Sequence, residues 1–474
     1  MVNKTLILAT IIFLLQSGCN LSPKIDREEI TPQKQTFLNQ KDSNKTLWEQ
    51  EWWKEFNDKN LNKFVKEIAE NSIDIKNAKL TAEKFFLLYK TSSSALWPSI
   101  SLTTGATRSK TNLGTFLPQG GSFKKTTYSF SFNASYEIDL FDKLSNSKKQ
   151  AYYTLLSAKE NEKAIQLSIT ANAVKLYLQY SQLLEEIEKT KEEIKVRKLL
   201  YKSAYSKYIN GVIPSDVYLA YLTLLNQSEN MLKQLEEIKS ELEHTIKQIA
   251  SSTEFNFKVS DFAKLSLKLP PVKPGLPSEL LLRRPDIQFA YMQIKSQACQ
   301  VGIDKASLFP SIKITGSDGF QSTSLSKLFK HESNVWNFGI NLFQSIFNRG
   351  ALKNKVEISR KDLEISINDY KKTVINAFGE VDKLLAQCRL IKEEIENLEK
   401  NLKSQKLTEK KKLEDYMSGN DTYEAYLNQR INLITTEITL SRLYLAYALN
   451  RVSLYKALGG GIEKINQLTI EVKK

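Results

Sequence analysis

The chain has 474 residues, a formal net charge of +15 and three cysteines. Its lysines are interleaved with glutamates, and even the densest basic run, at residues 410–412, is flanked by Glu409 and Glu414. This pattern is typical of a solvated helix surface and argues against a nucleic-acid partner. The two histidines, His244 and His331, lie in no recognisable ligand or nucleophile pattern, so we expect no enzyme activity, no metal and no cofactor.

The N-terminus has the order of features found in exported proteins. Lys4 precedes an apolar stretch at residues 5–15, which is too short to span a bilayer and fits the core of a signal peptide. The string Gln16-Ser17-Gly18-Cys19 follows directly and resembles a bacterial lipobox, with Gln16 where leucine is usual. We therefore predict a lipoprotein signal peptide at residues 1–18.

Lipidation would make Cys19 the first mature residue and the only covalent modification of the chain. Residues 19–60 are then an N-terminal lipid-anchored segment. Asn20 follows the cysteine where aspartate would mark retention in the inner membrane, so the outer membrane is favoured. An ordinary cleaved signal with a chance cysteine is the alternative.

Strict two-residue alternation predicts β-strands of a membrane type. At residues 128–140 the apolar positions are Tyr128, Phe130, Phe132, Ala134, Tyr136, Ile138 and Leu140, and polar residues stand between them. A similar pattern occurs at about 335–345, and partner strands are expected at about 99–108 and 311–319. The Gly/Ser/Thr-rich connectors at residues 103–125 and 315–333 are typical of exposed hairpin loops.

Four strands cannot close into a barrel, because open sheet edges do not survive in lipid and small membrane barrels need about eight strands. No apolar run of 18 residues follows the signal, so no transmembrane helix is expected. The strands therefore belong either to a soluble two-sided sheet or to a barrel pooled between several subunits.

Each strand pair is followed by a very long helical pattern. From residue 144 to residue 208 no proline or glycine interrupts the chain, which at 1.5 Å per residue gives a helix of roughly 100 Å. Apolar residues alternate at steps of four and three as in a coiled-coil seam, and the second half repeats the seam at Val374, Ala377, Val381, Leu384, Cys388, Ile391, Ile395, Leu398 and Leu402. We predict helical hairpins at about 144–250 and 350–457, with Ser215 and Asp421 as N-caps of the return helices. A coiled coil without a pore is the alternative.

Three landmarks recur in the same order, which indicates an internal duplication. Leu96-Trp97-Pro98-Ser99-Ile100 returns as Leu308-Phe309-Pro310-Ser311-Ile312, and Asp139-Leu140-Phe141-Asp142-Lys143 returns loosely as Ser345-Ile346-Phe347-Asn348-Arg349. The turn Tyr208-Ile209-Asn210-Gly211 returns as Tyr416-Met417-Ser418-Gly419. We assign residues 61–270 to a first repeat, 271–286 to a Pro-rich linker, 287–462 to a second repeat and 463–474 to a C-terminal tail.

Four motifs carry a specific family resemblance. The linker contains Leu276-Pro277-Ser278-Glu279-Leu280-Leu281-Leu282-Arg283-Arg284-Pro285-Asp286, which resembles the L-P-x-x-L-L-x-R-R-P-D signature of the outer-membrane factor family, TolC-like proteins, in its NodT/OprM-type efflux lipoprotein branch. Three further stretches match in order: the Trp-Trp motif at residues 52–56, the F-P segment at 306–310 and the L-Y-K-A-L-G-G-G ending within 450–461.

The resemblance implies a mixed α and β membrane protein. Three chains would form a homotrimer whose 12-stranded outer-membrane β-barrel takes four strands from each chain and continues as a long periplasmic α-helical barrel. It also implies an exit channel of a tripartite efflux system, anchored in outer-membrane lipid, that receives small molecules from a periplasmic adaptor (membrane fusion) protein and an inner-membrane pump. A conduit for type I polypeptide secretion and a non-channel coiled-coil surface lipoprotein are the alternatives.

The hairpin tips are the positions where the family closes its channel with a ring of acidic residues. Alignment on Gly419 places the family's gate aspartate at Asn428, a neutral residue, so the gate chemistry of this chain differs. The tip candidates are Asp216 and Tyr218 in the first repeat and Asp421, Glu424, Asn428 and Arg430 in the second. Arg430 is expected to pair with Asp421 or Glu424, and simple N-capping is the alternative role of Asp216 and Asp421.

Overall fold

The structure is a computed structural model that describes residues 20–34, 51–112, 122–265 and 277–460. The predicted signal peptide at 1–18, Cys19 and the predicted tail at 463–474 lie outside these residues. So do residues 35–50 of the predicted anchored segment, residues 113–121 of the first connector and residues 266–276, which include part of the linker. No helix within the described ranges has the length and apolarity that a membrane crossing requires.

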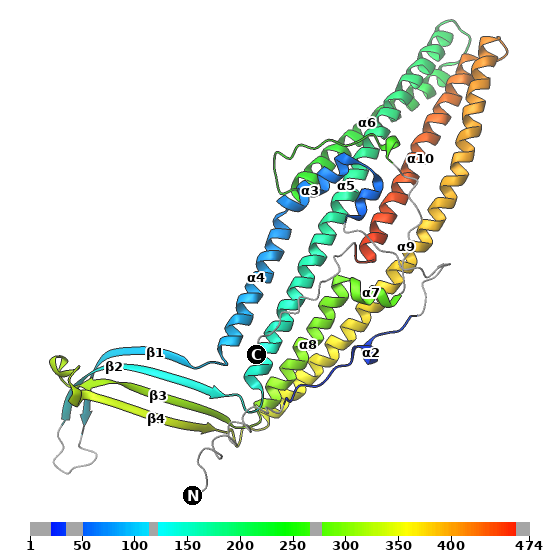
Figure 1. The fold of residues 1–474 in the computed structure, drawn as a ribbon. Coiled ribbons are helices and arrows are strands. Elements are labelled where there is room, and N and C mark those ends of the chain that lie inside the picture. Colours follow the sequence, from blue (N-terminus) through cyan, green and yellow to red (C-terminus); the bar gives the residue numbers. More distant parts are fainter. Residues whose placement is uncertain (1–19, 35–50, 113–121, 266–276, 461–474) are drawn as a thin grey trace. The chain divides into compact units, whose positions relative to one another are not determined.

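The element order shows the duplication directly (Figure 1). Before the first repeat unit lie α2 (Arg27–Ile30), η1 (Trp52–Phe56) and α3 (Lys59–Asn71). The unit itself comprises α4 (Ile73–Ser94), β1 (Ser99–Asn112), β2 (Ser122–Ile138), α5 (Lys143–Ile209) and α6 (Ser215–Ile249), and it is followed by η3 (Phe262–Lys264) and α7 (Pro277–Arg283). The second unit comprises α8 (Pro285–Ala306), β3 (Ser311–Ser322), η4 (Leu325–Lys327), η5 (His331–Ser333), β4 (Asn334–Phe343), α9 (Ala351–Met417) and α10 (Tyr423–Ala457). Corresponding helices have equal lengths of 22, 67 and 35 residues.

The strands extend into the segments expected as loops. The predicted connector at 103–125 is wrong at residues 103–112 and 122–125, and the one at 315–333 is wrong at residues 315–322. β1 runs to Asn112, β2 begins at Ser122, and β3 runs to Ser322. Thr- and Ser-rich segments have little apolar alternation to reveal a strand. They nevertheless pair here because the neighbouring strand supplies every backbone partner, down to the Asn112–Ser122 pair.

Two predicted helix N-caps are also wrong. Pro214 occupies the cap position of α6 and makes no side-chain cap, so Ser215 is already helical. Thr422 caps α10, since its hydroxyl accepts a hydrogen bond from the amide of Ala425. Asp421 lies one residue too early and accepts from the amide of Thr422 instead.

The four strands form one antiparallel sheet in the order β1-β2-β3-β4, so the two repeats join through β2 and β3. The register places most apolar residues of the four strands on one face, because Leu102 pairs with Phe132, Phe132 with Asp318 and Asp318 with Trp336. That face, which we call the apolar face, carries Ile100, Leu102, Tyr128, Phe130, Phe132, Ala134, Tyr136, Ile138, Ile312, Ile314, Phe320, Trp336, Phe338, Ile340 and Leu342. Phe123, Val335 and Phe343 lie on the other face. Serines, threonines, asparagines and glycines dominate the opposite face, and β1 and β4 are open edges.

The chain divides into two compact units that do not coincide with the two repeats. One unit holds residues 1–31, 81–159 and 289–371, and therefore the sheet; the other holds residues 32–80, 160–288 and 372–474, and therefore both hairpin tips. Each unit draws on both repeats, because the long helices α5 and α9 run through both units. The free cysteines Cys299 and Cys388 lie in α8 and α9.

The motifs of the N- and C-terminal regions meet in the core of the second unit. Trp52 of η1 stacks on Tyr455 of α10 with ring centroids 4.9 Å apart. The Tyr455 hydroxyl and the buried Arg451 both hydrogen-bond to Glu55. A buried guanidinium needs a carboxylate or hydroxyl partner. The Trp-Trp motif and the C-terminal motif therefore stabilise each other in one packed, hydrogen-bonded cluster.

The linker motif forms a second hydrogen-bonded cluster in the same unit. Arg284 makes a two-pronged pair with Asp286, at 2.7 and 3.0 Å, and also bonds to Glu380 of α9 and the carbonyl of Ala457, each at 2.8 Å. One buried side chain therefore fixes the start of α8 against α9 and the end of α10.

Candidate gate at the hairpin tips

Both hairpins turn through the same backbone geometry. α5 and α9 are followed by Gly211 and Gly419 with φ of 71° and 76°, a conformation that glycine adopts without strain. The amides of Gly211 and Val212 bond to the carbonyls of Tyr208 and Lys207 at 2.9 and 2.8 Å. The second turn repeats these bonds at residues 419 and 420. These two backbone hydrogen bonds end each long helix and therefore fix the position of the first residues of the tip.

The first tip is closed by tyrosines. Tyr218 packs against Tyr208 and Tyr205 with ring centroids 4.4 and 5.7 Å apart. Asp216 is exposed in the first turn of α6, where a carboxylate complements the positive end of the helix dipole. The observed contacts of this pair are therefore packing and helix stabilisation.

The second tip is closed by charge. Asp421 accepts hydrogen bonds from the Lys412 ammonium of α9 and from the amide of Thr422. These two bonds, the one from Lys412 first, hold the pKa of Asp421 below its usual range. Asp421 thereby ties the end of α9 to the turn.

Glu424 connects the two hairpins to each other. Its carboxylate accepts hydrogen bonds from Ser203 and Lys207 of α5, the latter at 2.7 Å. Partial burial raises the pKa of Glu424, but the hydrogen bonds from Lys207 and Ser203 outweigh it and leave the pKa below its ordinary value. The first turn of α10 is thus held against the last turns of α5.

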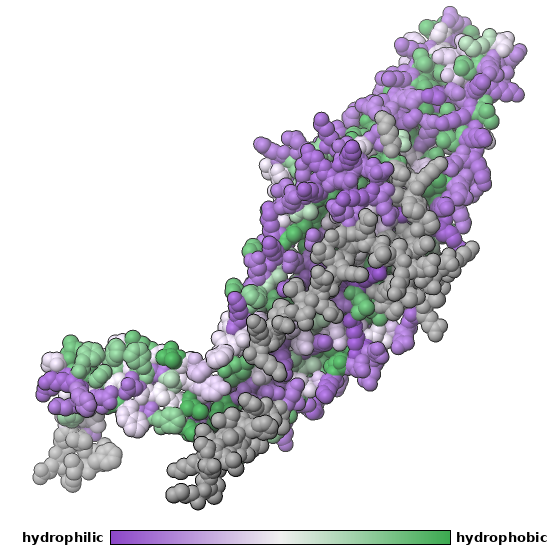
Figure 2. All heavy atoms as spheres, viewed as in Figure 1, coloured by the Kyte–Doolittle hydropathy of each residue, from purple (hydrophilic) through white to green (hydrophobic). Residues whose placement is uncertain are grey.

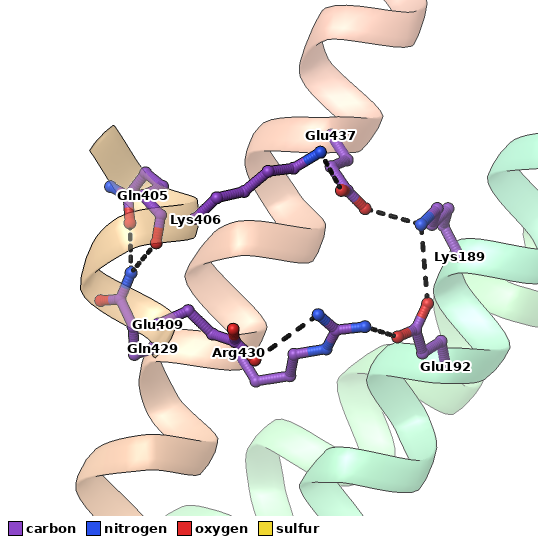
Figure 3. A network of polar contacts seen from close by, with 8 residues as sticks. All are labelled: Lys189, Glu192, Gln405, Lys406, Glu409, Gln429, Arg430 and Glu437. Carbon is purple, nitrogen blue, oxygen red and sulfur yellow. Dashed lines mark hydrogen bonds and ion pairs between the residues drawn. The ribbon is translucent and has the colours of Figure 1, made fainter. Parts of the chain in front are cut away.

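Arg430 does not pair with Asp421 or Glu424, and that prediction is wrong. Its guanidinium bonds to Glu192 of α5 and lies 3.6 Å from Glu409 of α9 (Figure 3). Asp421 and Glu424 precede it by about two turns of α10 and are already engaged by lysines. Arg430 therefore bridges three helices rather than closing the turn.

A network of alternating charge surrounds Arg430 (Figure 3). Lys189 of α5 contacts Glu437 of α10 at 2.6 Å and Glu192 at 3.7 Å, and Lys406 of α9 contacts Glu437 at 3.6 Å. We call the set Lys189, Glu192, Lys406, Glu409, Arg430 and Glu437 the charge network. Its three cations and three carboxylates balance, so no net charge is held between the helices.

The electrostatics of the charge network favour full ionisation. Partial burial raises the pKa of Glu192, but the hydrogen bond from Arg430 outweighs it and lowers the pKa below 4.5. Burial lowers the pKa of Arg430, and the hydrogen bond to Glu192 raises it above its ordinary value. At neutral pH the three helices are consequently joined by charged rather than neutral hydrogen bonds, the stronger kind.

Asn428, the position of the family's gate aspartate, is exposed and carries no charge. Its neighbour Gln429 hydrogen-bonds to Gln405 of α9. The charge concentrated near this level of α10 therefore belongs to Arg430 and its partners.

Sequence reasoning missed the other five members of the charge network, although a signal existed. The predicted seam of α9 ends with Leu398 and Leu402, and continuing its steps of three and four leads to Gln405, Glu409 and Lys412. Polar residues thus replace apolar ones at seam positions near the tip. A polar residue at a core position of a coiled coil selects the partner helix and its register, at a cost in stability.

The overall architecture matches that of known outer-membrane channels. The crystal structure of the Campylobacter jejuni CmeC outer membrane channel superposes with a TM-score of 0.84 at 25% identity, covering 94% of this chain and 96% of that one. The family model "Outer membrane efflux protein" matches residues 64–245 and 276–460. The chain belongs to this family.

Curated relatives agree over nearly the whole length. The chain is 27% identical to the antibiotic efflux pump outer membrane protein ArpC of Pseudomonas putida, with 97% of this chain and 96% of that protein covered. It is 26% identical to the cation efflux system protein CusC of Escherichia coli, with 95% and 97% covered. The protein is therefore an outer-membrane efflux protein, as the sequence motifs predicted.

Replacing Arg430 with Ala should raise the single-channel conductance of the reconstituted protein. The substitution removes the guanidinium that bridges three helices, so Glu192 and Glu409 lose their contact with residue 430. Half-exposed pairs contribute up to about 1 kcal/mol, so the closed-to-open ratio should fall by a factor of about 5. Arg389→Ala is the matched control, since Arg389 makes a surface pair with Glu393 on its own helix. Equal conductance of the two variants, with intact assembly, would exclude Arg430 as a latch.

Acid should open the same contacts. The pKa of Glu192 is lowered from 4.5, so its stabilising contribution is fully present above pH 4.5 and is lost as the pH falls through the folded pKa. Conductance should rise as the pH drops below about 4.5. Glu192→Gln should show raised conductance at neutral pH and a smaller acid response. An identical acid response in this variant would assign the effect to other groups.

Proposed function

We propose that this protein is the exit duct of a tripartite efflux system and works as a homotrimer. The observation that carries the proposal is the register of the sheet, which collects most of its large apolar side chains on one face while both edges remain open. An apolar face of this size seeks lipid or protein. An open edge in lipid leaves backbone groups without hydrogen bonds, so other chains must complete the sheet.

Three copies of the four-stranded sheet supply twelve strands, an even number that membrane barrels use. β4 of one copy pairs with β1 of the next, and the apolar face turns to lipid. Two copies would give an eight-stranded barrel, and the interior of a barrel of that size is filled by side chains. The polar, small residues of the opposite face suit a water-filled lumen.

The helical hairpins continue the duct through the periplasm. α5 and α9 each contain 67 residues, which corresponds to roughly 100 Å of helix. The tips then narrow the resting duct, with the charge network and the pair of Glu424 with Lys207 as latches. The pair of Asp421 with Lys412 braces the second turn, and Asp216 and Tyr218 line the first tip. Opening requires the second hairpin to separate from α5.

A periplasmic adaptor docks at the tips and an inner-membrane pump supplies the cargo. Apolar side chains at both turns are available for the adaptor, since Val212 is 68% exposed and Met417 79% exposed. The cargo is a small molecule or ion, the class that the names of ArpC and CusC share. We assign the selection of this cargo to the pump.

The proposal is tested by assembly and insertion. Phe132→Arg or Phe338→Arg places a charge on the proposed lipid face, where both side chains are exposed, and should cost roughly 2–4 kcal/mol if the site lies near mid-bilayer. Ser131→Arg, on the opposite face, is the control and should insert. Native mass spectrometry in mild detergent should give three chains for the wild type. A stable, conducting monomer would overturn the trimer.

Cys19 should carry the covalent lipid and be the first mature residue. The lipobox-like string that ends at this residue motivates the assignment. Mass spectrometry of the mature N-terminus reads the modification directly. Cys19→Ala should lose the lipid and keep the trimer, because the strands provide an independent hold on the membrane. An unmodified chain that starts at another residue would refute the lipid anchor.

A further inference from the structure

The hairpin end of the sheet carries a cluster of positive charge. Arg108 and Lys110 lie at the end of β1, and Lys124 lies at the start of β2. All three side chains are exposed, and none has an ion pair with a residue that the structure describes. No aspartate or glutamate occurs between Glu83 and Glu137. Figure 2 shows hydrophilic residues gathered at this end of the sheet.

The register brings these charges together rather than apart. Lys110 pairs directly with Lys124, and Arg108 pairs with Thr126, the next residue of the same face. Side chains directly opposite each other have Cβ atoms about 5 Å apart, and like charges at that spacing are destabilising. A small neutral residue at either position would avoid this repulsion. The arrangement therefore points to a bound anion that offsets the repulsion between the two lysines.

The three cations lie on the apolar face, in line with its aromatic residues. The even-numbered residues of β2 continue from Lys124 through Thr126 to Tyr128 and Phe130 on one side of the sheet. Phe329, from the turn between β3 and β4, packs against Phe130 and Phe320 with ring centroids 5.5 and 5.7 Å away. An aromatic band followed by positive charge is the order expected at a boundary between hydrocarbon and headgroups.

We propose that Arg108, Lys110 and Lys124 form a site for the phosphate groups of an anionic lipid in the outer leaflet. The inference rests on the proposed function, which turns the apolar face toward lipid. Chain order then places the site outside, because the opposite ends of all four strands connect to the helices. Charged side chains cost little on the lipid face near the interface, and each basic residue near an anionic surface gains affinity.

A lipid fits this surface better than a protein or a nucleic acid. The charges continue a face that is otherwise apolar, so the occupant must present acyl chains beside phosphate. Inorganic phosphate satisfies only the charges. A partner protein would have to cover Phe130 and Tyr128, which the proposed barrel already exposes to the bilayer.

The test compares two variants that each lose two charges. Lys110→Gln with Lys124→Gln removes the opposed pair of the site. Lys125→Gln with Lys313→Gln is the control, since both lysines lie on the opposite face of the sheet. Each protein is reconstituted in phosphatidylethanolamine nanodiscs with bisphosphorylated lipid A, and native mass spectrometry measures the lipid retained. Conductance is recorded from the same preparations.

The wild type and the control should retain lipid A, and the site variant should bind it about 10- to 30-fold more weakly. Lipid A without phosphates should bind to all three proteins equally, and inorganic phosphate should compete poorly. If the site variant and the control bind lipid A equally, the proposed lipid site is overturned. If the same preparations still form conducting channels, the proposed function stands. Absence of trimers and conductance in the wild type would overturn both.

Discussion

The register of the four strands is the constraint on which the rest of the molecule depends. Because side chains alternate with a period of two, a slip of one residue would move every aromatic side chain to the other face. In the observed register Leu102 pairs with Phe132 and Asp318 with Trp336, which keeps these aromatic side chains on one face. The same pairing also leaves the sheet with two open edges in a single copy, and the proposed assembly rests on those edges.

The duplicated helices form two hairpins with unlike tips. Both hairpins share helix lengths and a glycine turn, yet tyrosines close the first and charge pairs close the second. α10 packs against α5 through Val196, Leu200, Ile431 and Ile434 and against α9 through Ile395 and Leu440. The charge network lies beside this packing, and Leu200 and Leu427 continue the apolar contacts beyond it toward the tip. Polar contacts are cheap to exchange for water compared with a closed apolar core, which suits a surface that must separate.

The net charge of +15 is distributed unevenly and serves different purposes. Within the charge network the signs balance, and several other helix lysines pair with glutamates three or four residues away, as Lys361 pairs with Glu364. The hairpin end of β1 and β2 has no such compensation. Its local excess of positive charge is therefore a property of this end of the sheet rather than of the whole surface.

Local sequence patterns are enough to predict most of the elements and the class of the protein. Alternation at residues 128–140, the uninterrupted helix from residue 144 and the motif at residues 276–286 are local patterns, and each depends only on neighbours along the chain. The full length of β1 and β2 escaped, because Thr- and Ser-rich strands carry no alternation. Only the tertiary structure decided the partners of Arg430 and Trp52. Glu192 lies 238 residues from Arg430, and contacts at that separation depend on how α10 is seated between α5 and α9, which no local pattern encodes.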